Sequence, residues 1–234
     1  MPTTDHLKKL VVLTGAGISA ESGIKTFRDS NGLWEEYDIM EVAHINGWKK
    51  HPELVLQFYN MRRKQIKAAQ PNAAHIGLVE LEKEWDVHII TQNIDDLHER
   101  AGSKQVMHLH GEIVKMRSEK NEELIVLATD EIELGQTASD GAQFRPHIVW
   151  FGEQVPMIPF AIQLVEKADV LVIIGTSLQV YPAASLFEYA APGIPVIIID
   201  KHIPSNEALA ASIVIEQSAG VGVKMLKEKL KQYL

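Results

Sequence analysis

The stretch Leu10-Val11-Val12-Leu13-Thr14-Gly15-Ala16-Gly17-Ile18-Ser19-Ala20 decides the fold. Its first four residues form an apolar run of the kind that is buried in a parallel strand. The next six have the G-x-G-x-x-A spacing of a dinucleotide-binding turn, in which glycines allow a tight turn and a close approach of backbone amides to a pyrophosphate. The stretch therefore predicts a strand, a phosphate-binding turn and the start of a helix.

Three further apolar runs, at 87–90, 170–174 and 196–199, are also followed by polar or glycine-rich residues. Helical patterns lie between the runs, at 52–69, from Asn72 through Leu81, at 159–167 and at 221–234. Strands that alternate with helices predict an α/β fold with a doubly wound, Rossmann-like parallel sheet. Ligands of such sheets bind beyond the carboxyl ends of the strands, which is where the polar clusters of this chain lie.

Two stretches interrupt the alternation. The segment 28–70 is too long for a simple crossover, and 112–147 carries short β-like runs at 113–116 and 124–127. We expect both to be insertions that form a small second module, in which 135–143 is mobile. The predicted division assigns 1–34, 71–111 and 148–234 to the Rossmann-like, dinucleotide-binding domain, and 35–70 and 112–147 to the small module.

Composition excludes several classes of protein. The 234 residues include 23 basic and 31 acidic ones, a net charge of −8, which argues against a nucleic-acid partner. No apolar run approaches the roughly 18 residues of a membrane span, and the first residues lack the form of a signal peptide. The chain has no cysteine, which excludes disulfides, thiolate nucleophiles and cysteine-bound zinc. We expect a cytoplasmic monomer that binds no membrane.

Two polar clusters carry the candidate chemistry. Asn93 and Asp95 follow the second strand and either point into one crevice or merely cap a strand-to-helix turn. If 106–111 is a strand, His108 and His110 face the same side of it. Such a pair could bind a metal, although no third ligand is evident, or one of the two could be a general base, or both could be surface residues.

Seven motifs, in order along residues 10–220, together resemble the sirtuin family of NAD-dependent protein deacylases. They are Gly15-Ala16-Gly17-Ile18-Ser19, Gly23-Ile24 with Phe27-Arg28, Pro71-Asn72-Ala73-Ala74-His75, Gln92-Asn93-Ile94-Asp95, His110-Gly111, Phe151-Gly152-Glu153 and Gly175-Thr176-Ser177.

The resemblance implies a role for each motif. The catalytic residues would be His110 as general base, with Asn93 and Asp95 holding the nicotinamide carboxamide and the ribose. Where this chain has Asp200 the family usually has asparagine. The residues expected to bind NAD are Gly15, Ala16, Gly17, Ser19, Ala20, Phe27, Arg28, Trp34, Gln92, Asn93, Ile94, Asp95, Gly175, Thr176, Ser177, Asp200, Lys201 and Ala219.

The resemblance also implies that NAD is consumed as a co-substrate. The carbonyl oxygen of an acyl-lysine attacks the ribose carbon that nicotinamide leaves, and His110 accepts a proton from a ribose hydroxyl. The products are nicotinamide, O-acyl-ADP-ribose and free lysine. The partners would be acyl-lysine proteins, whose backbone would pair as a strand with Val149 and with the loop Phe151-Gly152-Glu153.

Tyr59 and Arg62 indicate which acyl group the site accepts. They are three residues apart on a predicted helix, so they share a face, and a phenol with a guanidinium can bind a carboxylate. Arg62 could instead belong to a solvated basic face of the helix. The sirtuin subgroup that removes malonyl and succinyl groups has Tyr-x-x-Arg here and a small residue where this chain has Ala43. The resemblance thus implies a desuccinylase and demalonylase, with deacetylation as a further activity.

Most sirtuins bind a structural zinc through four cysteines between the His-Gly and Phe-Gly-Glu motifs. This chain has none, and Ser118 stands about where the first would be, so we predict no metal. We expect the insertion at 112–147 to be held instead by apolar contacts of Ile113, Val114, Leu124, Ile125 and Val126. The alternatives to a deacylase are a sirtuin-type ADP-ribosyltransferase and a non-catalytic NAD or ADP-ribose sensor, and His110 argues against both.

Overall fold

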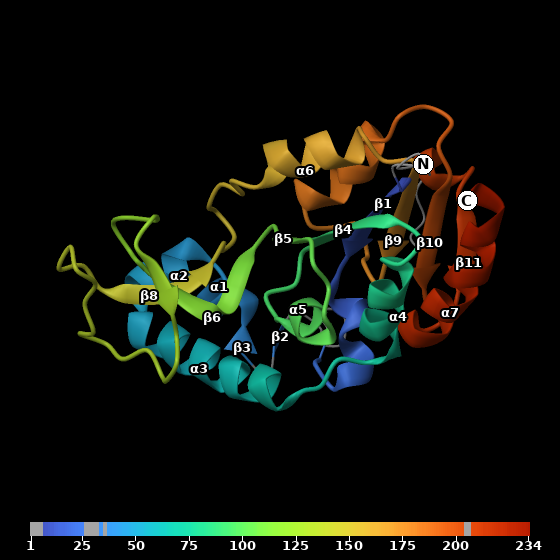
Figure 1. The fold of residues 1–234 in the computed structure, drawn as a ribbon. Coiled ribbons are helices and arrows are strands. Elements are labelled where there is room, and N and C mark those ends of the chain that lie inside the picture. The colour runs from blue at the N-terminus through green and yellow to red at the C-terminus, as the bar shows by residue number, and fades with distance from the viewer. Residues whose placement is uncertain (1–6, 26–32, 35–36, 204–206) are drawn as a thin grey trace, which may run out of the picture.

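A parallel sheet forms the centre of the molecule (Figure 1). The computed structural model describes residues 7–25, 33–34, 37–203 and 207–234. In this part of the chain the sheet has six strands in the order β11-β10-β9-β1-β4-β5. Their bounds are β1 (Lys9–Thr14), β4 (Asp86–Thr91), β5 (Val106–His108), β9 (Val170–Ile174), β10 (Val196–Asp200) and β11 (Ile213–Glu216).

The strand order reverses between β1 and β9. From β1 the chain runs outward to β4 and β5, then crosses back to β9 and runs the other way to β10 and β11. Neighbouring strands pair in parallel, with Leu10 aligned on Val87 in β4 and on Val170 in β9. This is a doubly wound sheet, and the reversal point is where such sheets bind ligands.

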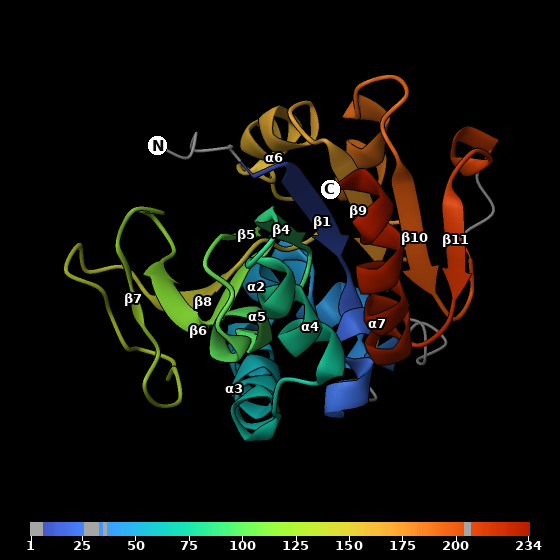
Figure 2. The same ribbon diagram turned by 45° about the vertical axis from the view of Figure 1, so that its right-hand side comes forward.

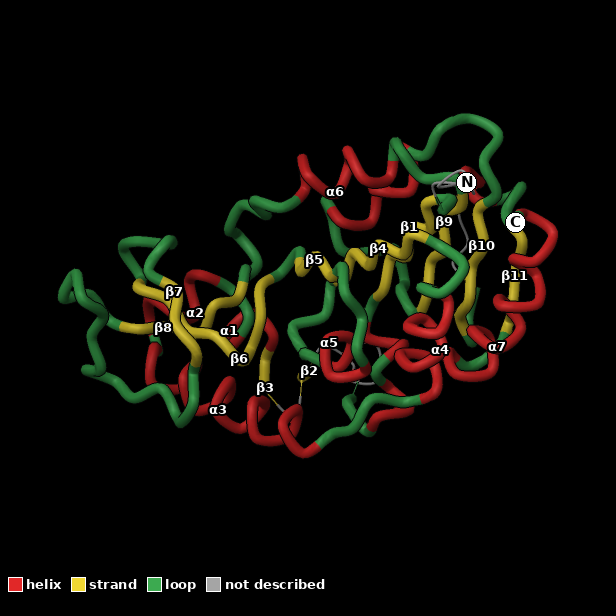
Figure 3. Tube along the Cα trace, viewed as in Figure 1, coloured by secondary structure: helices red, strands yellow, loops and turns green. Residues whose placement is uncertain are grey.

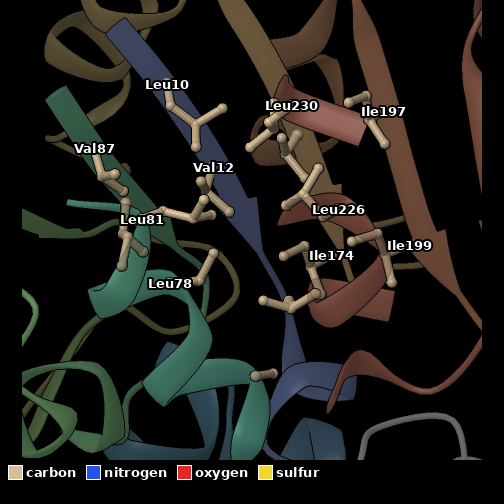
Figure 4. Packing of buried hydrophobic residues seen from close by; sticks show 14 of the residues in the cluster. Leu10, Val12, Leu78, Leu81, Val87, Ile174, Ile197, Ile199, Leu226 and Leu230 are labelled. Atoms are coloured by element: carbon tan, nitrogen blue, oxygen red, sulfur yellow. The ribbon is translucent and has the colours of Figure 1, made fainter. Parts of the chain in front are cut away.

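Helices cover both faces of the sheet (Figure 3). Because side chains alternate along a strand, Leu10 and Val12 pack toward α4 (Ala73–Leu81) and α7 (Ala219–Leu230). Val11 and Leu13 lie in a second core with α6 (Ile158–Val165) and the 3-10 helix η4 (Ala183–Tyr189). The central strands are therefore largely apolar, and every residue of β9 is buried, as a sheet covered on both faces requires. Figure 4 shows the first of these cores.

Local signals place the helix boundaries. Asn72 caps α4: its side-chain oxygen accepts a hydrogen bond from the backbone N–H of Ala74, and its own backbone N–H donates to His75 Nδ1. Pro52 occupies the first turn of α3 (Pro52–Ala68). The predicted C-terminal helix begins two residues early, at Ala219, and ends in a 3-10 turn, η6 (Lys231–Tyr233).

The small module lies beyond β5 at one side of the sheet (Figure 2). Its three-stranded antiparallel sheet has the order β7-β6-β8, and α3 packs against it. A core of Phe58, Tyr59, Ile113 and Trp150 joins the helices to this sheet. The elements not yet given bounds are β2 (Leu33–Trp34), β3 (Tyr37–Asp38), α1 (Ile39–Val42), α2 (Ile45–Lys50), α5 (Leu97–Ala101), β6 (Gly111–Ser118), β7 (Ile125–Leu127), β8 (Phe144–Ile148) and η5 (Glu207–Leu209).

The expected apolar contacts of the insert are only partly present. Ile113 is fully buried, but Ile125 and Val126 are exposed because β7 is the edge strand of its sheet. Hydrogen bonds of Ser118 instead join the end of β6 to the segment that contains Asp140. Its hydroxyl donates to Asp140 Oδ2 at 2.7 Å and accepts from the backbone N–H groups of Lys120 and Asn121.

The segment 135–143, expected to be mobile, folds back on itself. Thr137 and Gln143 form a β-bridge, and the backbone N–H of Ala138 donates to Ala142 O. Within the described part of the chain, no group of three or more potential metal ligands lies together. No helix there has both the length and the apolar character that crossing a membrane requires.

Three strands have weak sequence signals. β5 has three residues, and β11 is a short run at the edge of the large sheet. β8 contains Arg145, Pro146 and His147, which no pattern of alternating hydrophobicity marks as a strand. Pairing with β6 decides that β8 is a strand, whereas β11 has β-branched residues but is only four residues long.

The packing of α7 can be tested at Leu226, which is fully buried against the sheet near Ile199 and Ile174 (Figure 4). We expect Leu226→Ala to lower the free energy of unfolding by about 2–5 kcal/mol, because it leaves a cavity. The neighbouring Met225 is 43% exposed, so Met225→Ala should change stability by about 0.5 kcal/mol or less. Urea denaturation measures both, and equal effects would contradict this packing.

Candidate active site

A cavity of about 780 Å³ lies at the carboxyl ends of β1, β4 and β9 and extends to the small module. Every residue that the sequence predicted for the site and that the structure describes lines this cavity. Phe27, Arg28 and the side chain of Trp34 lie outside the described residues. The structure thus brings together residues from positions 15 to 219, whose individual roles remain predictions.

Glycine backbones form the floor of the cavity at the reversal point of the sheet. The N–H of Gly17 donates to Gly175 O at 2.8 Å, and a Cβ on Gly17 would lie 2.6 Å from Gly175 Cα. Gly175 itself has φ +62°, a left-handed conformation that favours glycine. The turn after β1 and the turn after β9 therefore pack backbone against backbone, and both line the cavity, where glycine backbone can approach a dinucleotide closely.

The predicted helix after Gly17 is wrong. The chain forms two 3-10 turns instead, η1 (Ala16–Ile18) and η2 (Ala20–Ser22), and Gly23 in the left-handed conformation ends the second. A three-residue turn has little of the dipole of a long helix. Backbone N–H groups of the turn, rather than a helix dipole, are therefore what this segment offers to a phosphate.

Asn93, Ser19 and Asp95 form a buried hydrogen-bonded cluster. Asn93 Nδ2 donates to Gly15 O and to Ser19 Oγ, both at 3.2 Å, and Ser19 Oγ donates to Asp95 Oδ2 at 3.0 Å. Asp95 also accepts from the N–H of Leu97, so it both supports the start of α5 and lines the cavity. Burial raises the pKa of Asp95, and the bonds from Leu97 and Ser19 oppose that shift.

His110 is held with one ring nitrogen on the backbone. Its Nδ1 lies 2.9 Å from Gln92 O, so Nδ1 carries the proton and Nε2 keeps its lone pair. Burial lowers the pKa of His110, and the hydrogen bond to Gln92 offsets part of that shift. At neutral pH the ring is uncharged and able to accept a proton. Gln92 is fixed in turn, because its Nε2 donates to Thr176 Oγ1 at 3.1 Å.

His108 has a different environment from His110. Its Nε2 lies 2.8 Å from Glu99 Oε1 and its Nδ1 lies 3.0 Å from Asn93 O. Burial alone would lower the pKa of His108, but Glu99, the backbone of Asn93 and the charge of Glu112 together outweigh it, so the net shift is upward. The two histidines thus have separate partners. The geometry of His110 favours the interpretation that this residue is the general base.

Tyr59 and Arg62 of α3 line the part of the cavity in the small module, together with Ala43. Tyr59 is 1% exposed and Arg62 is 3% exposed, so the alternative that Arg62 belongs to a solvated basic face of the helix is wrong. Lys64 does belong to such a face, because its side chain is 73% exposed and is paired with Glu131. Arg62 Nη1 donates to Gln65 Oε1 at 3.1 Å, one turn along the helix.

The Phe151-Gly152-Glu153 loop is tied to the rest of the site through its backbone. The N–H of Phe151 donates to Ala43 O, and that of Val149 donates to His110 O, both at 2.9 Å. At Gly152, with φ +84°, a Cβ would meet the ring of His44 at 3.0 Å. A substrate strand would therefore have to pair with the remaining backbone groups of this loop, and that pairing remains a prediction.

Sequence reasoning missed some residues that line the cavity. Glu21 is one: it accepts hydrogen bonds from Gly220 N at 2.7 Å and Ser218 Oγ at 3.1 Å, joining the glycine turn to the start of α7. No local pattern could reveal a contact between positions so far apart. Trp150 is another, and its place before Phe151 was the one signal of a role in the site.

Comparison with known proteins identifies the family. The Sir2 family model matches residues 15–182. The chain belongs to the Sir2 family. An NAD-dependent protein deacylase of Helicobacter pylori is 57% identical to this Sir2 chain over 205 residues, which are 86% of this chain and 90% of that protein. One of the same description from Bacteroides thetaiotaomicron is 49% identical over 230 residues, 96% and 98% of the two chains.

Solved Sir2 structures share the fold. A Sir2 homologue in complex with NAD is 38% identical and covers 97% of this chain and 91% of its own, with a TM-score of 0.84. A Sir2 protein with a deacetylated p53 peptide and 3′-O-acetyl ADP ribose is 30% identical, covers 95% and 94%, and has a TM-score of 0.79. These findings confirm the family and the Rossmann-like fold that the sequence predicted.

The glycine floor can be tested at Gly175. An alanine there would have both a strained φ and a Cβ 2.5 Å from Ile18 N, whereas Gly193, with φ +86°, has no atom within 4 Å of such a Cβ. We expect Gly193→Ala to cost about 1 kcal/mol of stability and Gly175→Ala clearly more. Calorimetry should also show that Gly175→Ala loses affinity for ADP-ribose. Similar results for both variants would refute the close contact.

Proposed function

We propose that this Sir2 chain is an NAD-dependent protein-lysine deacylase that removes succinyl and malonyl groups and also accepts acetyl-lysine. One observation carries the proposal: buried Tyr59 and Arg62 line the same cavity as His110. A lysine whose acyl group reached Arg62 would lie with its reacting end in the cavity that holds the candidate base.

The charge of Arg62 supports an acidic acyl group. A buried guanidinium binds a carboxylate through two parallel charge-assisted hydrogen bonds, each stronger than a neutral one. Burial raises the pKa of Tyr59, so its phenol keeps its proton and can donate a further bond. Ala43 leaves room beside them. An acetyl group offers no carboxylate to either donor.

The other part of the cavity fits NAD. Gly15, Gly17 and Gly175 provide the cradle for its pyrophosphate, and Asn93 and Asp95 would hold the nicotinamide carboxamide and ribose. When bound, NAD supplies the glycosidic bond that is broken and the ribose that carries the acyl group away. The names of the relatives and the NAD complex of a homologue support this assignment.

His110 would act as the general base. Gln92 O holds its Nδ1–H, so Nε2 accepts the proton of a ribose hydroxyl as the acyl group is transferred. After the lysine amine leaves, one water molecule adds to the acyl carbon and opens its bond to one ribose oxygen, so the products are nicotinamide, free lysine and O-acyl-ADP-ribose.

The direct test is to incubate the protein with NAD and matched acetyl-, malonyl- and succinyl-lysine peptides, and to identify the products by mass spectrometry. We expect O-acyl-ADP-ribose in each case and the highest kcat/KM for the two acidic acyl groups. ADP-ribose attached to protein would indicate a transferase instead, and no nicotinamide release with any peptide would indicate a sensor.

The role of Arg62 predicts a change of selectivity. Charge-assisted hydrogen bonds contribute about 1.5–3 kcal/mol, so Arg62→Met should lower the succinyl-to-acetyl ratio of kcat/KM by about ten- to 150-fold. Lys64→Met is the matched control on the same helix, because Lys64 is exposed and should leave the ratio unchanged. An equal loss on both peptides in Arg62→Met would exclude this role.

The role of His110 predicts the pH dependence. The base must be uncharged, and burial lowers its pKa below the usual value of about 6.5, so turnover should stay constant down to a pH below 6.5 and fall only beneath it. Steady-state kcat measured from pH 5 to pH 8 checks this. His110→Ala should bind NAD yet lose about 10²–10⁴-fold in turnover. Wild-type turnover in that variant would refute the assignment.

A further inference from the structure

We propose that Trp150 is a specificity-determining residue of this site, because its indole N–H fixes the direction in which the Tyr59 hydroxyl donates its proton. That hydroxyl is then presented to the carboxylate of an acidic acyl group. The inference rests on the proposed function and adds a residue that acts through Tyr59.

The contact that carries the inference joins Trp150 Nε1 to Tyr59 Oη at 2.9 Å, and both residues are buried. An indole N–H can only donate, so this bond has one possible polarity. It occupies the acceptor side of the Tyr59 oxygen, and the phenolic proton must point away from Trp150. Tyr59 lines the cavity beside Arg62, which is where an acceptor on the acyl group would lie.

Two side chains pack against the indole itself. The guanidinium carbon of Arg145 lies 3.5 Å from the centroid of the Trp150 ring, and the ring of Trp48 packs against it at 5.4 Å. Arg145 binds both oxygens of Glu153, at 2.7 and 2.9 Å, and the backbone N–H of Trp150 donates to Glu153 Oε2. The indole N–H therefore has a fixed direction before any substrate enters.

This arrangement explains what Glu153 does. The loop that contains Glu153 is expected to pair with the substrate backbone, while the Glu153 side chain binds Arg145 and lies 3.7 Å from Arg117. These arginines face each other across β6 and β8. Glu153 thus couples the substrate loop to the small module, and Trp150 extends that coupling to Tyr59.

Only acidic acyl groups benefit from the orientation. A malonyl or succinyl carboxylate accepts the Tyr59 proton, whereas the methyl group of an acetyl has no acceptor. Trp150→Phe keeps an aromatic ring between Arg145 and Trp48 but removes the N–H. We expect the variant to lower the succinyl-to-acetyl ratio of kcat/KM about tenfold, mainly through KM for the succinyl peptide.

A double-mutant cycle separates positioning from packing. In a Tyr59→Phe background there is no hydroxyl to orient, so adding Trp150→Phe should not lower the ratio further. The matched control is Trp85→Phe, a buried indole in the core of the large sheet, which should leave the ratio unchanged. A ratio that still falls about tenfold in the Tyr59→Phe background would show that Trp150 acts through packing and would overturn the inference.

The proposed function and this inference fail in different ways. A wild-type protein that does not prefer succinyl or malonyl peptides would refute the proposed function, and the inference with it. A wild-type preference that Trp150→Phe leaves unchanged would refute the inference alone, since thermal melting can verify that the variant is folded.

Discussion

The contact between the Gly17 and Gly175 backbones is the constraint on which the site depends. It joins the turns that follow β1 and β9, the neighbouring strands at which the sheet reverses its order. Glycines at both positions let the two turns touch backbone to backbone, and both turns line the cavity. The residues that follow β4 line the same cavity from the adjacent strand. The order of the strands therefore decides which residues meet in the site.

Burial shifts the pKa values of His110 and Asp95, and backbone hydrogen bonds oppose part of each shift. His110 is fixed by Gln92 O and Asp95 by the N–H of Leu97, while burial opposes the charged form of each. Both anchors lie directly beyond β4. The sheet therefore positions not only the atoms but also the protons of the candidate catalytic groups, and no side-chain partner is needed to choose the tautomer of His110.

The sequence predicted strands β1, β4, β9 and β10, the cap of α4 and most of the polar residues that line the cavity, because each has a local pattern. It could not predict that the turn after Gly17 becomes two 3-10 turns, since Gly23 and the buried bonds of Ser19 decide this in the folded chain. The bond from Trp150 to Tyr59 and the bonds from Gly220 and Ser218 to Glu21 span large parts of the chain. Such contacts follow from tertiary packing, which has no local signature.

Hydrogen bonds of Ser118, rather than cysteine side chains, hold this end of the small module together. An alcohol, the carboxylate of Asp140 and two backbone amides close the insert where the sequence resemblance would place zinc-binding thiolates. Such a closure has no ion for a chelator to extract and no sulfur for a peroxide to oxidise. This set of hydrogen bonds therefore depends neither on the supply of a metal nor on the redox state of a thiol.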